Sequence, residues 1–139
     1  MKRLPLLALG AGLLVATGSA MAANELMTSI PSDSYSVTDW YKQNVYDPQN
    51  NKIGQIMDVL VSPDGKVNSL IVGVGGFLGA GEKDVAVDFS GVKRTTKDNS
   101  IYLTMNTTKD ALQSAPGFKY DRQTTKWVPD TSKGSKATQ

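Results

Sequence analysis

Two apolar segments flank a short turn sequence near the middle of the chain, and this arrangement restricts the fold more than any other feature. The segments run from Ile53 to Val61 and from Val67 to Val74. Between them, Ser62-Pro63-Asp64-Gly65 combines a proline, which presets φ, with a glycine, which tolerates positive φ. We therefore expect the two segments to pair as a β-hairpin.

Alternation of apolar and polar residues continues in later segments. Residues 85–89 and 101–105 place apolar side chains at every second position, which is typical of strands with one buried face. A short strand around Val45-Tyr46 is also expected, with polar turns over residues 47–51 and 97–99. Five or six short, mainly antiparallel strands with little helix predict an all-β fold, either a small barrel or a rolled sheet.

Helix is expected in only two short segments. Thr107 or Thr108 can cap one or two turns, which would end before Pro116. The segment 36–39 resembles a capping box and predicts a single turn.

The first 22 residues have the pattern of an export signal. Lys2 and Arg3 form a positive amino-terminal region, an apolar stretch follows over residues 4–15, and Ala20-Met21-Ala22 fits the small-residue cleavage rule. The alternative is a transmembrane anchor, which needs about 20 strongly apolar residues, and this stretch is shorter. We expect cleavage after about Ala22 and a periplasmic protein, with release outside the cell left open.

Three further segments are expected after the signal. Residues 23–35 resemble a linker, residues 36–120 carry the strand pattern, and residues 121–139 form a basic tail that is expected to be flexible. Weak contact of this tail with an anionic membrane surface is an open alternative, since each positive charge there contributes about 1 kcal/mol.

Composition and charge exclude several classes of function. The chain has no His and no Cys, which excludes a Ser-His-Asp triad, a thiol nucleophile and a zinc-thiolate site. Without the signal, 13 basic and 13 acidic residues remain. Binding of nucleic acid depends mainly on phosphate neutralisation, so no nucleic acid partner is expected. No metal and no cofactor are expected either.

A glycine-rich segment between residues 73 and 84 is the most specific motif. A dinucleotide fingerprint starting at Gly73 needs glycine at position 78, which is Leu78, and a P-loop starting at Gly76 needs lysine at position 82, which is Glu82. The segment is also followed by a strand pattern instead of a helix. Its glycines therefore indicate a place where one strand ends and the chain turns back.

The same segment carries a resemblance to a known family. The run from Gly75 to Val87, GGFLGAGEKDVAV, is similar to the signature of the PRC-barrel family. Residues 52–61 and 64–67 also resemble the opening hairpin of that family. The similarity extends over roughly Ser36 to Tyr120. It departs from the family pattern at Asp88, where proline is common, and at Gln43-Asn44, where a glycine is common.

The resemblance implies a small β-barrel that serves as a docking module and is not an enzyme. In the reaction-centre H subunit the domain sits on a membrane complex, and in ribosome maturation factors it supports a ribosomal contact. For an exported chain we expect a cell-envelope protein or membrane complex as partner. The residues expected to bind it lie in the glycine-rich segment: Gly75, Gly76, Phe77, Leu78, Gly79, Gly81, Glu82, Lys83 and Asp84.

Three alternatives stay open at this point. One is a hydrolase or isomerase that uses carboxylates alone, with Asp58, Glu82 and Asp84 as candidates. The second is a carrier of a small ligand, which is less favoured because a barrel of this size usually fills with its own side chains. The third is an accessory role in a membrane electron-transfer complex.

Several charged positions have a simpler structural interpretation. Asp47, with Gln49, Asn51 and Asp58, follows part of a calcium-loop register but lacks its glycine and its glutamate, which favours a polar turn. The run 82–84 is interpreted as a solvated turn. Asp58, among apolar neighbours, is interpreted as a hydrogen-bonded carboxylate that ties the glycine-rich loop, because an unpartnered buried charge is costly.

Overall fold

A computed structural model describes residues 25–75 and 81–132, together with residues 3, 5, 10–15 and 18 of the first 24. The chain divides into two units, Met1–Ser34 and Tyr35–Gln139. The described residues of the first unit contain no helix and no strand, and no described helix of either unit is long and apolar enough to span a membrane. The expected cleavage site at residues 20–22 lies outside the described residues.

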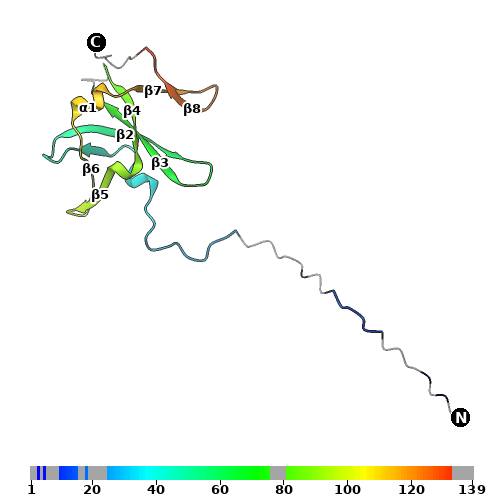
Figure 1. The fold of residues 1–139 in the computed structure, drawn as a ribbon. Coiled ribbons are helices and arrows are strands. Elements are labelled where there is room, and N and C mark those ends of the chain that lie inside the picture. Colours follow the sequence, from blue (N-terminus) through cyan, green and yellow to red (C-terminus); the bar gives the residue numbers. More distant parts are fainter. Residues whose placement is uncertain are drawn as a thin grey trace. The chain divides into compact units, whose positions relative to one another are not determined.

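The second unit contains one eight-stranded sheet (Figure 1). Its strands are β1 (Asn44–Tyr46), β2 (Lys52–Val61), β3 (Val67–Val74), β4 (Lys83–Asp88), β5 (Val92–Lys97), β6 (Ser100–Met105), β7 (Gly117–Asp121) and β8 (Lys126–Pro129). They are ordered β5-β6-β1-β2-β3-β4-β7-β8, and every neighbouring pair is antiparallel except β1 and β6. The all-β, barrel-type fold is confirmed, with more strands than the five or six expected.

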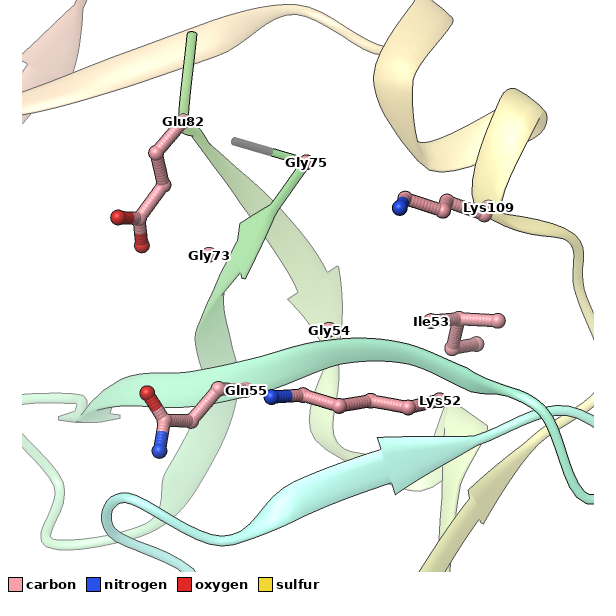
Figure 2. Close-up of a pocket in the computed structure, with 8 residues that line it drawn as sticks. All are labelled: Lys52, Ile53, Gly54, Gln55, Gly73, Gly75, Glu82 and Lys109. Atoms are coloured by element: carbon pink, nitrogen blue, oxygen red, sulfur yellow. The ribbon is translucent and has the colours of Figure 1, made fainter. Parts of the chain in front are cut away.

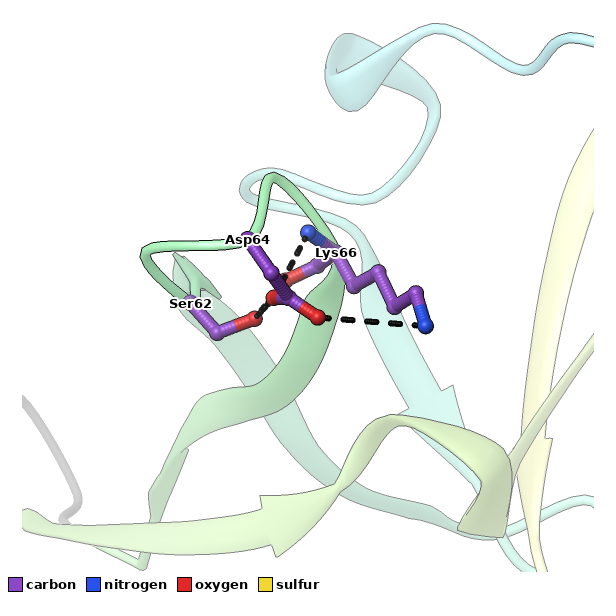
Figure 3. Close-up of polar contacts among 3 residues, drawn as sticks. All are labelled: Ser62, Asp64 and Lys66. Carbon is purple, nitrogen blue, oxygen red and sulfur yellow. Dashed lines mark hydrogen bonds and ion pairs between the residues drawn. The ribbon is translucent and has the colours of Figure 1, made fainter.

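The expected hairpin is confirmed as β2 and β3, which pair from Gln55 opposite Gly73 to Val61 opposite Val67. In its turn, the Ser62 hydroxyl donates to the Asp64 carboxylate and to the carbonyl of Lys66 (Figure 3). The Lys66 ammonium lies 3.8 Å from the same carboxylate. These groups stabilise the charged form of the Asp64 carboxylate and so lower its pKa. The hydrogen bond from Ser62 has the largest effect on this pKa, and the backbone N–H of Lys66 has the next largest.

The core lies between the central strands and a short helix. Its fully buried members come from five strands, and the largest are Val45, Ile53, Ile56, Leu70, Val72, Val74, Val85 and Leu103. Leu112 adds a buried side chain from α1 (Lys109–Ser114). This arrangement explains the apolar character of β3, where a continuous run of residues is buried instead of every second one.

Both expected helical turns are confirmed. Thr108 caps α1 through its hydroxyl, which accepts from the backbone N–H of Ala111 at 3.1 Å. The first turn is the 3-10 helix η1 (Val37–Asp39), capped by Ser36. A second 3-10 helix, η2 (Phe89–Gly91), follows β4 and was not expected.

The expectation of a flexible tail over residues 121–139 is wrong for its first part. Strand β8 pairs with β7, and the Asp121 carboxylate closes the turn by accepting from the backbone N–H of Gln123 at 2.9 Å and the Thr124 hydroxyl at 2.8 Å. The composition of this segment is polar, and its order comes from pairing and from one tryptophan contact described below. Residues 133–139 lie outside the described part of the chain.

Strand β5 was also not anticipated, because only its first residue, Val92, is buried. It forms one edge of the sheet, where polar and charged side chains such as Lys93 and Lys97 discourage pairing with other chains. Because few side chains of such a strand are buried, its sequence shows no clear alternation of apolar and polar residues.

Candidate functional site

The glycine-rich segment connects β3 to β4, and its two ends are well defined. Gly75 follows β3 with φ of +76°, and Gly81 precedes β4 with φ of +78°. Both values lie in the left-handed region, which glycine adopts without the steric cost of a Cβ. The expected binding residues Gly76, Phe77, Leu78 and Gly79 lie outside the described residues.

Lys83 connects the second end of this segment to α1. Its side chain is only 9% exposed, and its ammonium donates a 2.8 Å hydrogen bond to the backbone carbonyl of Gln113. Lys83 and Asp84 belong to β4 and pair with Val74 and Gly73 of β3. The interpretation of residues 82–84 as a solvated turn is therefore wrong, because the strand begins one residue after Glu82.

A cavity of about 270 Å³ opens beside the ends of the glycine-rich segment (Figure 2). It combines two lysines, a glutamate and an amide with an apolar side chain and three glycines. Its lining residues are Lys52, Ile53, Gly54, Gln55, Gly73, Gly75, Glu82 and Lys109. They come from β2, β3, the residues just after β3 and just before β4, and the first position of α1, so the cavity depends on how these elements pack.

Two of the expected binding residues, Gly75 and Glu82, line this cavity. Glu82 lies so close above Gly73 that a Cβ there would meet its carboxylate oxygen, and Met57 Cγ would be 3.0 Å away. Glycine at position 73 therefore makes room for the Glu82 carboxylate. Sequence reasoning missed Lys52, Gln55 and Lys109, which lie far from the motif in the chain.

A second depression, of about 580 Å³, lies between the β2–β3 hairpin and the β7–β8 hairpin. Trp127 is one of its lining residues, and the indole Nε1 donates a 2.7 Å hydrogen bond to Asp58 Oδ2. Tyr120 meets the Trp127 ring edge-on, with centroids 5.8 Å apart. The side chains of Val61 and Tyr120 beside it are about half exposed, at 58% and 48%.

The interpretation of Asp58 as a hydrogen-bonded carboxylate is confirmed. Among the described residues, its side-chain partner is Trp127 of β8, and not a residue of the glycine-rich loop as expected. Its other oxygen accepts from the backbone N–H of Val59 at 2.8 Å. Asp58 lines the second depression and Glu82 lines the first cavity. The structure does not bring the three carboxylates of the hydrolase or isomerase alternative into one of these cavities.

The turn at Asp47 uses its carboxylate internally. That carboxylate accepts from the backbone N–H groups of Gln49 and Asn51 and from the Asn51 side-chain amide, at 2.8 to 2.9 Å. The Asn51 side-chain bond is the largest cause of a lowered pKa at Asp47. This geometry confirms a polar turn. Among the described residues, no three acidic, His or Cys side chains converge as a metal site would require.

One comparison with known proteins identifies a family. The model of the PRC-barrel domain matches residues 32–112, which is more than half of the chain and includes β1 to β6 and most of α1. The β7–β8 hairpin lies beyond the matched residues. No curated protein matches the chain.

Proposed function

Since this chain belongs to the PRC-barrel domain family, we propose that it is an exported, non-enzymatic docking module of the bacterial cell envelope. The family suggests a module that is not catalytic. Its partner is a protein of the envelope or a membrane complex, and it docks through the face that carries the glycine-rich segment, residues 75–84. Residues 1–22 direct the export, after which the chain acts in the periplasm.

The observation that carries the docking proposal is the way both ends of the glycine-rich segment are held. Gly75 leaves a fully buried stretch of β3, and Lys83 is anchored to α1 by its bond to the Gln113 carbonyl. Binding residues are often found on loops that a stable scaffold positions. A segment that contains Phe77 and Leu78 between two such ends offers apolar side chains for a partner.

The test is capture of the partner from the native periplasm. The tagged chain, expressed with its own signal, is crosslinked mildly, recovered and analysed by mass spectrometry. We expect one dominant envelope protein with the unmodified chain and its loss with the double replacement Phe77→Ser and Leu78→Ser.

The matched control is Val61→Ser. Val61 is 58% exposed and lies near the turn of the β2–β3 hairpin, whereas Gly75 follows the opposite end of β3. Both variants should first show the circular dichroism of the unmodified chain. Capture that survives the double replacement but is lost with Val61→Ser would overturn the proposed surface in favour of the second depression.

A further inference from the structure

We propose that the cavity beside the glycine-rich segment binds a small zwitterion, a molecule that carries one carboxylate and one ammonium group as an α-amino acid does. Lys109 receives the carboxylate of the ligand, and Glu82 together with the Gln55 carbonyl oxygen receives its ammonium. This inference goes beyond the docking proposal and does not rest on it, because it uses none of the residues 76–80.

The first argument is the separation of charge within the cavity. Figure 2 shows the Glu82 carboxylate on one side and the Lys109 ammonium on the other, while Lys52 runs along the floor and its ammonium ends beside Gln55. An anion without an ammonium group would bring a second negative charge near Glu82. A cation without a carboxylate would meet two ammonium groups. A ligand with both charges can meet groups of both signs in the cavity, because opposite charges attract and like charges repel.

The second argument is the orientation of Gln55. Its amide nitrogen donates a 3.0 Å hydrogen bond to the backbone carbonyl of Lys42, so the amide cannot rotate freely. With the nitrogen engaged there, the carbonyl oxygen is turned toward the side of the cavity on which Glu82 lies (Figure 2). A fixed carbonyl and a carboxylate are acceptors suited to the three N–H donors of an ammonium group.

The third argument is the placement of Glu82. Its carboxylate lies directly above Gly73, where any Cβ would collide with it. The absence of a side chain at position 73 therefore lets the carboxylate reach the cavity wall. Gly75, which has a positive φ, also lines the cavity.

The fourth argument is size. A volume of about 270 Å³ lies near the lower end of the usual range for ligand sites, which begins near 300 Å³. The cavity therefore has room for a molecule of amino-acid size.

The test compares L-alanine with two probes that each lack one of its charged groups. L-Alanine carries both charges, propionate carries only the carboxylate, and ethylammonium carries only the ammonium. Each is titrated to about 10 mM, the range in which weak sites saturate, while backbone amide signals of the full chain without its signal are followed by NMR. We expect saturable shifts at Gly54, Gly73 and Gly75 with alanine, and at least tenfold weaker binding of the other two probes.

Two variants then test which residue binds the carboxylate of the ligand and which binds its ammonium group. Lys109→Met should weaken alanine and propionate together by about tenfold. Glu82→Gln should reduce the preference for alanine over propionate by a similar factor, because the ammonium loses its carboxylate partner. The control is Lys93→Met, an exposed lysine on β5 that does not line the cavity, and it should leave all three titrations unchanged.

Three results would overturn the inference. They are the absence of saturable shifts with alanine, equal affinity for the three probes, and an effect of Lys93→Met as large as that of Lys109→Met. Amide signals of β5 and β6, which do not contribute to the cavity, report whether each variant keeps the native fold. Partner capture is tested by replacing Phe77 and Leu78, and alanine binding by replacing Lys109 and Glu82, so the failure of one proposal is distinguishable from the failure of the other.

Discussion

The indole Nε1 of Trp127 donates a 2.7 Å hydrogen bond to Oδ2 of Asp58, which joins strand β8 to strand β2 across 69 positions of the chain. The contact lies between segments that are not neighbours in the sheet. It joins the β7–β8 hairpin, which lies beyond the residues that match the family, to the central hairpin.

Replacing Trp127 by phenylalanine should lower the free energy of unfolding by about 1–3 kcal/mol, because a partly buried carboxylate loses a charge-assisted hydrogen bond. Denaturant unfolding followed by circular dichroism measures the change. Tyr120→Phe serves as control: it keeps the edge-on ring contact and removes only a hydroxyl from a half-exposed residue. An equal loss in both variants, or no loss with Trp127→Phe, would contradict the assignment of this stability to the bond with Asp58.

The pair of Arg94 and Asp39 should stabilise the attachment of η1 to β5. The guanidinium donates a 2.8 Å bond to the Asp39 carboxylate and lies 4.3 Å from the Tyr35 ring centroid, and the two charged side chains are only 17% and 30% exposed. Asp39→Asn is expected to lower the free energy of unfolding by about 1–2 kcal/mol, which lies between the usual values for exposed and buried pairs.

The control for this pair is Lys66→Met, which removes the exposed ion pair with Asp64 at 3.8 Å. No measurable change in thermal unfolding is expected there, because exposed pairs are screened by solvent and salt. If Asp39→Asn also leaves thermal unfolding unchanged, the Arg94 side chain is held by Tyr35 and by packing instead of the ion pair.

Gly73→Ala should destabilise the fold and displace Glu82. A methyl group at this position would collide with the Glu82 carboxylate and approach Met57 Cγ to 3.0 Å, so we expect a loss of about 1–3 kcal/mol from overpacking. Gly91→Ala is the matched control, since its nearest atom, Met105 Cε, is 3.8 Å away. Thermal unfolding of both variants gives the comparison, and tolerance of Gly73→Ala would mean that Glu82 can leave its position at little cost.

Acid should destabilise the protein through carboxylates that hold turns. Hydrogen bonds lower the folded-state pKa values of four carboxyl groups below their usual range: Asp47, Asp64, Asp88 and Asp121. The largest cause is the bond from Asn51 at Asp47, from Ser62 at Asp64, from Ser90 at Asp88 and from Gln123 at Asp121. A depressed folded-state pKa contributes stability above the unfolded value, and this contribution is lost as the pH falls through the folded value. The melting temperature should therefore decline as the pH drops below about 4.

The variant Asp47→Asn tests this origin of the acid sensitivity. It should flatten the decline of the melting temperature at low pH, because one of the four titrating carboxylates is gone. Asp33→Asn is the control, since Asp33 makes none of the hydrogen bonds that hold these turns. An identical slope in Asp47→Asn and the unmodified chain would contradict the assignment.

Local chemistry in the sequence determined the parts of the fold that depend on a few adjacent residues. The turn at residues 62–65 follows from a proline and a glycine, the cap of α1 follows from the threonine at position 108, and the turn at Asp47 follows from a carboxylate with amide donors two and four residues later. Each of these needs only short-range hydrogen bonds and φ preferences, which a pattern can express.

Tertiary structure alone decided the features that depend on residues far apart in the chain. A polar segment such as 124–130 has no burial pattern, yet β8 is ordered because it pairs with β7 and because Trp127 meets Asp58. Lys83 follows a turn motif, yet it is buried because α1 offers it the Gln113 carbonyl. The cavity likewise requires Lys109 of α1 and Glu82 to come together in its lining. Sheet order and helix packing set such distances, and neither is encoded in the spacing of residues along one strand.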